Sequence, residues 1–149
     1  MPFKMIHPAT ELRHVNDIIG YGVFATEFIP AGTITWVRDE LDQTFTAQQA
    51  EKLPPQYRAI LDKYAFTDGD GRLLLCWDHA RFINHSCEAT CLSGGYDFEI
   101  AVRNIQPREE LTDDYGTLNL CEPTKNSGNI AHRGFARRAP QSPIYVSHE

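Results

Sequence analysis

The segment from Arg81 to Cys87, with the sequence RFINHSC, gathers side chains that could do chemistry in the middle of the chain. Asn84 and His85 offer hydrogen-bond donors and acceptors, and Cys87 offers a thiol that could serve as a nucleophile or a metal ligand. Two apolar residues separate Arg81 from these polar groups, so burial and hydrogen bonding are combined. In isolation the segment fits a buried polar turn. Its meaning therefore depends on the segments around it.

The cysteine pattern argues against a metal site. The four cysteines include no CxxC pair, and only Cys121 follows Cys87 and Cys91, which are four residues apart. A tetrahedral zinc site needs about four ligands. Because the chain starts without a secretory leader, we expect a cytoplasmic or nuclear protein whose cysteines are reduced thiols. No metal is expected.

Two further segments carry residues suited to a site. Gly20-Tyr21-Gly22 places two glycines in an apolar stretch, which indicates a bulge or a close approach of the backbone. Residues 110–116, ELTDDYG, place Tyr115 directly after two acidic residues. A glycine pair alone is typical of a turn, and a lone tyrosine is typical of a half-buried side chain bonded to backbone. The three segments together are more specific than any one of them.

Short strands must position these segments. Residues 11–15 alternate in a way that predicts a strand, and residues 17–25 and 33–37 are expected to form a hairpin around the turn at 30–32. Glycine-rich turns predict two more strand pairs, one across residues 68–71 and one across Gly94-Gly95. In the second pair apolar and acidic residues alternate, with Phe98, Ile100 and Val102 on one face and Asp97 and Glu99 on the other.

Helical signals are few. Thr46 with Gln49 has the form of a capping box, and it predicts a short helix that ends at Pro54-Pro55. A second helix is expected from Gln56 to about Tyr64, and only weak helical character follows at 129–138. The chain is therefore predicted to be mainly β with short helices.

Size and charge narrow the class of protein. A chain of 149 residues has room for one domain, and no apolar run approaches the roughly 20 residues that cross a bilayer. Residues 1–116 hold ten Lys/Arg against eighteen Asp/Glu, a balance of −8, whereas residues 117–149 hold four against two, a balance of +2. The acidic body favours a basic peptide as partner and argues against direct nucleic-acid binding. The lack of a long apolar run argues against a membrane.

Taken in order and at this spacing, the three segments resemble the SET domain of protein-lysine methyltransferases over roughly residues 11–116. The resemblance implies several small sheets around a pseudoknot, with a SET domain at 1–116. It also implies that 117–149 is a post-SET-like tail, here without the usual cysteine-rich zinc motif. The implied cofactor is S-adenosylmethionine. Gly20, Tyr21 and Gly22 would meet its methionine end, and Asn84 and His85 would hold its amino and adenine portions.

The resemblance also assigns the reacting end of the site. Tyr115 would be the catalytic residue at the floor of a lysine channel, where it orients the amine. Tyr64 fits either an aromatic of that channel or core packing. Arg81 is expected to anchor the motif by an ion pair. Trp36 and Trp77 are assigned to the core, and Cys87 to a buried structural thiol.

Departures from the family pattern leave two readings open. Asp113 stands two residues before Tyr115, where Phe or Tyr is usual, and Glu88-Ala89-Thr90 replaces a Pro-Asn turn. Phe135 or Tyr145 would have to close the site, or a second subunit in a homodimer would. The first reading is a methyltransferase acting on a lysine of a histone, a histone-like protein or another basic protein. The alternative is a catalytically silent binding module.

Overall fold

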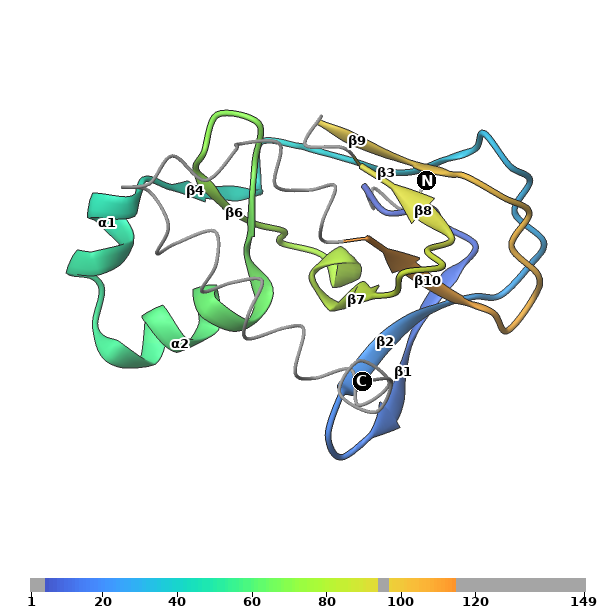
Figure 1. Cartoon of the computed structure of the whole chain (residues 1–149), viewed down its shortest axis with the longest axis horizontal. Coiled ribbons are helices and arrows are strands. Elements are labelled where there is room, and N and C mark those ends of the chain that lie inside the picture. The colour runs from blue at the N-terminus through green and yellow to red at the C-terminus, as the bar shows by residue number, and fades with distance from the viewer. Residues whose placement is uncertain (1–4, 94–96, 115–149) are drawn as a thin grey trace.

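Strands dominate the part of the chain that the structure describes. The computed structural model describes residues 5–93 and 97–114, which are coloured in Figure 1. The following predicted features lie outside these ranges: Tyr115, Cys121, Phe135, Tyr145 and the helix at 129–138. Within them the mainly β fold with short helices is confirmed. The strands are β1 Thr10–Asn16, β2 Gly20–Ala25, β3 Ile34–Val37, β4 Gln43–Phe45, β5 Phe66–Thr67, β6 Leu73–Leu75, β7 Asn84–His85, β8 Cys91–Leu92, β9 Phe98–Ala101 and β10 Glu110–Asp113.

Strand β10 lies at the middle of the larger sheet, whose order is β1-β2-β10-β8-β9-β3. It pairs antiparallel with β2 and parallel with β7 and β8, so segments far apart in sequence meet along four residues. The view in Figure 1 places β10 close to β7, β8 and β2. The last described strand thus ties together the segments that carry the motifs.

The prediction that residues 17–25 and 33–37 form a hairpin is wrong. β2 pairs with β1 and β10, whereas β3 pairs with β9. The turn at 30–32 does exist, with Gly32 at φ +83, but Ile29 just before it bridges to Ile105. That long-range bridge directs the chain to the far end of the sheet.

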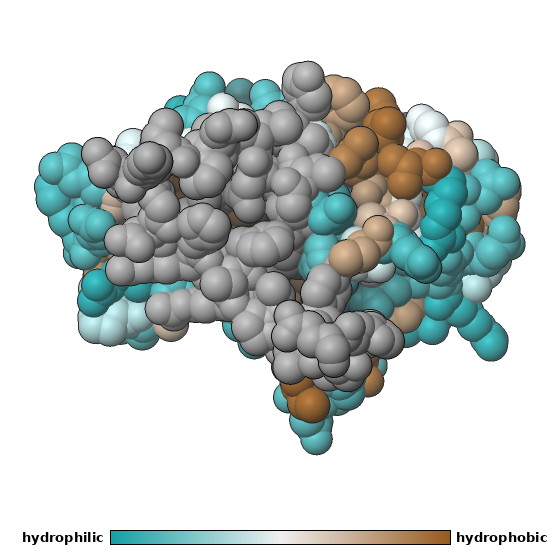
Figure 2. Space-filling view, viewed as in Figure 1, coloured by the Kyte–Doolittle hydropathy of each residue, from teal (hydrophilic) through white to brown (hydrophobic). Residues whose placement is uncertain are grey.

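The hairpin of β8 and β9 is confirmed, with an unexpected inner face. Its residues alternate as predicted, but Glu99 is only 4% exposed, whereas Phe98 is 42% and Val102 47% exposed. Figure 2 shows apolar surface over the region of β3 and β9. An acidic side chain therefore occupies the buried side of this strand.

Both predicted helices are confirmed. The helix α1, Ala47–Lys52, begins with a complete capping box in which Thr46 Oγ1 accepts from Gln49 N and Gln49 Oε1 accepts from Thr46 N. The helix α2, Pro55–Tyr64, carries proline in its first turn, where the missing N–H costs nothing. Both helices contact a smaller sheet of order β4-β6-β5. Its β5–β6 pair is the strand pair predicted across residues 68–71.

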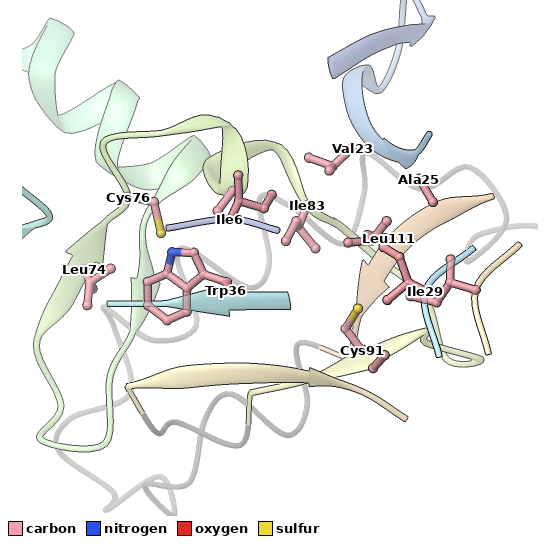
Figure 3. Packing of buried hydrophobic residues seen from close by; sticks show 13 residues of the cluster. Ile6, Val23, Ala25, Ile29, Trp36, Leu74, Cys76, Ile83, Cys91 and Leu111 are labelled. Carbon is pink, nitrogen blue, oxygen red and sulfur yellow. The ribbon is translucent and has the colours of Figure 1, made fainter. Parts of the chain in front are cut away.

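The main core combines side chains of the larger sheet with Leu74 of the smaller sheet and with side chains from residues 76–83. Figure 3 shows its side chains gathered from several elements, with Leu111 of β10 among them. Leu111 is fully buried, which contributes about 1.5–3 kcal/mol. Trp36 is 3% exposed, as predicted, whereas Trp77 is only half-buried and donates its indole N–H to Asp39 Oδ2 at 3.0 Å.

Candidate functional site

Asn84 joins the three sequence motifs. Its Nδ2 donates to the carbonyl of Tyr21 at 3.1 Å and to Glu110 Oε1 at 2.7 Å. Asn84 lies in β7, Tyr21 in β2 and Glu110 in β10, and these strands hold the groups in register. Burial raises the pKa of Glu110, and the hydrogen bond from Asn84 partly offsets this. One amide therefore links the glycine segment, the RFINHSC segment and the ELTDDYG segment.

The two glycines of β2 have different roles. A Cβ on Gly22 would overlap Glu110 Oε1 and lie 3.0 Å from both Asn84 Nδ2 and Val15 Cγ2, so the strands can meet here only without a side chain. Gly20 has φ +83, and a Cβ there would meet nothing within 4 Å. Gly22 permits close packing, whereas Gly20 supplies a left-handed backbone beside open space.

His85 is held on the buried side of β7. Its Nδ1–H donates to the carbonyl of Asp113 at 3.2 Å, and the same carbonyl accepts from Ser86 N at 3.1 Å. Burial lowers the pKa of His85, and the nearby Asp114 carboxylate opposes this less strongly. The imidazole is therefore neutral near pH 7, and it fastens the RFINHSC segment to the strand that leads toward Tyr115.

An aromatic row borders a small cavity beside Asn84. Tyr21 packs edge-on against Phe82 with ring centroids 6.0 Å apart, and Phe82 packs edge-on against Tyr64 at 5.2 Å. The cavity has a volume of about 160 Å³. It is lined by Ile19, Gly20, Tyr21, Lys63, Tyr64, Arg81, Phe82 and Asn84. Tyr64 is half-buried, so it both packs on Phe82 and faces this space.

Two cations also border the cavity. Lys63 Nζ lies 5.1 Å from the centre of the Tyr64 ring, within the range of a cation–π contact. Arg81 donates to the carbonyls of Trp77 at 2.5 Å and Asp78 at 3.2 Å, so it braces the start of its motif through backbone contacts. Arg81 also lines a second hollow of about 640 Å³ between α2 and the smaller sheet.

Four site residues were not singled out from sequence: Ile19, Lys63, Phe82 and Glu110. Phe82 and Glu110 lie inside the two specific motifs, so their presence there was a usable signal. Lys63 is adjacent to Tyr64 at the end of α2, and only the fold brings it to Asn84. Of the predicted residues, Gly20, Tyr21, Tyr64 and Asn84 line one cavity, whereas His85 faces the core and Tyr115 lies outside the described residues.

The prediction for Cys87 is wrong, because its side chain is exposed. Glu88 N donates to Ser86 Oγ at 3.1 Å, so Cys87 lies within a tight turn that follows β7. Cys76 and Cys91 are the buried thiols of this region. In the ranges 5–93 and 97–114, no group of three or more His, Cys, Asp or Glu is placed to hold a metal ion. No helix in these ranges is long and apolar enough to cross a membrane.

Comparison with known proteins agrees with this geometry. The family model of the SET domain matches residues 20–116, which is more than half of the chain. A crystal structure of a Plasmodium falciparum protein, named a putative histone methyltransferase, matches with a TM-score of 0.53 and 22% identity. The match covers 74% of this chain and 96% of that one, and at this identity it shows a shared fold. A search of curated proteins finds no match. The chain belongs to the SET domain family, whose members are generally lysine methyltransferases.

Proposed function

We propose that this chain is an S-adenosylmethionine-dependent protein-lysine N-methyltransferase. The observation that supports it best is the junction at Asn84, which brings the glycine segment and the ELTDDYG segment together beside one cavity. A structural turn would need no such cavity, and family membership makes methyl transfer the first reaction to consider.

The residues at the cavity fit the proposed cofactor. S-adenosylmethionine would supply a methyl group activated by a sulfonium. Its carboxylate suits Lys63 or Arg81, and its apolar portions suit the aromatic row. Gly20 leaves open space where a larger residue would place a side chain. The cavity is smaller than the roughly 300–1,000 Å³ of usual ligand pockets, so it would receive one portion of the cofactor.

The reaction needs alignment and a neutral amine. Methyl transfer to nitrogen is an in-line displacement, so the protein must hold the amine in line and exclude water. A lysine with a pKa near 10.4 is charged at pH 7, and desolvation in a narrow channel favours its neutral form. We assign the orienting role to Tyr115, with Tyr64 as an aromatic wall of the channel.

A basic protein segment is the substrate that the charge distribution favours. Residues 1–116 carry a net charge of −8, which attracts lysine-rich segments and repels nucleic acid. The proposed substrates are a histone, a histone-like protein or another basic protein.

The first test is transfer of a labelled methyl group from S-adenosylmethionine to lysine in mixed basic proteins. Tyr115→Phe should lower the rate by about 100-fold or more, within the range of positioned catalytic hydroxyls, while cofactor binding by calorimetry is retained. Tyr57→Phe, an exposed tyrosine on α2, is the matched control and should keep full activity.

The same measurements separate the alternative function. Cofactor binding without transfer to any lysine would favour a silent binding module, which the unusual Asp113 also suggests. An absence of both binding and transfer by the full chain would refute the proposed enzyme.

A further inference from the structure

Two carboxyls are buried together beside β8. Glu99 is 4% and Asp113 3% exposed. Asp113 is the partner of Cys91 in β8, and Cys91 is the partner of Ala101 in β9. Glu99 stands two residues before Ala101 and therefore faces the same side of the sheet. Ionised carboxyls are costly in such a place unless they are paired.

Each carboxyl of this pair accepts a hydrogen bond from a hydroxyl. Thr35 Oγ1 donates to Glu99 Oε1 at 2.7 Å, and Ser93 Oγ donates to Asp113 Oδ2 at 3.1 Å. The two carboxyls also interact with each other. Asp113 Oδ1 is buried and meets no donor among residues 5–93 and 97–114. Two buried carboxyls in contact are best satisfied when one of them is protonated and donates to the other.

The surroundings keep a negative charge unfavourable. Burial, followed by the charge of Glu99, raises the pKa of Asp113 to about 8, and burial raises the pKa of Glu99. Cys91 faces the pair from β8, and burial raises the pKa of its thiol, so it stays neutral. His85 contacts the Asp113 backbone from β7 and is also neutral, and Asp114 directly follows the end of β10.

We propose that Glu99 and Asp113 are a proton-sharing positioning pair that holds β10 against β8 and β9 and thereby fixes the strand leading into Tyr115. Asp113 of this pair stands two positions before Tyr115, where an aromatic residue is usual in the family. When the shared proton leaves, two carboxylates repel each other inside the sheet. The catalytic meaning of the pair rests on the proposed function, but its existence does not.

Denaturation of the full chain in urea between pH 5 and pH 8 tests the pair. The native wild type holds a proton that the unfolded chain, with an ordinary Asp pKa near 3.8, releases. Its stability should therefore fall as the pH rises from about 4 toward 8. The unfolding equilibrium constant of the wild type should rise at least about tenfold per pH unit more steeply than that of the double variant Asp113→Asn, Glu99→Gln, because burial would keep a proton on the carboxyl left in either single variant.

The controls keep this test decisive. Glu27→Gln, at an exposed acid, should show the wild-type slope. Equal slopes for the wild type and the double variant would overturn the proposal. If a variant does not fold, calorimetric unfolding of the wild type in two buffers of different protonation enthalpy counts the protons released near pH 7. A release of about one supports the pair, and none overturns it.

Activity provides the readout of position. The methyl-transfer rate of Asp113→Asn relative to wild type should increase between pH 7 and pH 9, because only the wild type loses a shared proton. A constant ratio would overturn the positioning role. Absence of transfer by every variant at every pH would refute the proposed function instead. The pH dependence of stability in urea would still test the pair.

Discussion

Replacing Gly22 by alanine tests the junction of β2, β7 and β10 most directly. The new Cβ would overlap Glu110 Oε1 and press on Asn84 Nδ2, so Glu110 must move and its 2.7 Å hydrogen bond must weaken. Overpacking of this kind costs about 1–3 kcal/mol, and a hydrogen bond to a charged group contributes about 1.5–3 kcal/mol. Gly22→Ala should therefore lower the free energy of unfolding by about 2–5 kcal/mol.

A double-mutant cycle separates the clash from general damage. Glu110→Ala removes the atom that the new Cβ would overlap, and it alone costs the hydrogen bond to Asn84. The double variant Gly22→Ala, Glu110→Ala should therefore be more stable than the sum of the two losses, by about 1–3 kcal/mol in urea denaturation. Contact with Val15 remains in both backgrounds. Losses that add to within about 0.5 kcal/mol would refute the proposed steric coupling.

Two further predictions use matched positions. Gly20→Ala and Gly32→Ala should each lose about 1–2 kcal/mol, since both residues have φ +83 and open space around the Cβ. Only Gly20→Ala should weaken S-adenosylmethionine binding, by about tenfold in calorimetry, and equal binding by the two variants would contradict the placement of the cofactor. The pKa of His85 is lowered by burial, so its contribution to stability is present above pH 6.5 and lost as the pH falls below it. Relative to wild type, His85→Gln should therefore gain stability as the pH falls from 6.5 to 5, and an unchanged difference between the two in urea denaturation would contradict a buried neutral imidazole.

Local signals in the sequence predicted local structure. Thr46 and Gln49 are three residues apart, and the capping box that they form depends only on that spacing. The turn at 68–71 likewise joins strands that are its immediate neighbours. Such features depend on a few adjacent residues, and tertiary packing did not override them.

The pairing of strands that are distant in sequence could not be predicted from local signals. The pairing of residues 33–37 was mistaken, because a turn signal at 30–32 does not say which distant strand the chain then meets. The burial of Glu99 could not be predicted from sequence either, because its partner Asp113 is distant in sequence and lies across β8. Cys87 was misplaced because it lies in an exposed turn just after β7 and not in a strand that faces the core.

The candidate site was partly predictable, because its motifs carry their own contacts. Asn84 and Gly22 were identified from sequence, and they meet at Glu110. Lys63 reaches the same cavity only through the packing of α2, which no motif encodes. The role of Tyr115 stays a prediction.

The central position of β10 has a consequence for synthesis of the protein. β10 is the last described strand to leave the ribosome, yet β2, β7 and β8 all pair with it. Until residues 110–113 emerge, the inner edges of β2 and β8 carry unpaired backbone groups, which invite pairing with other chains. The pairing of Glu110 with Phe24 closes a loop of 86 residues, and contacts so distant in sequence form slowly. A nascent chain of this protein should therefore depend on chaperones that cover strand edges until translation has passed β10.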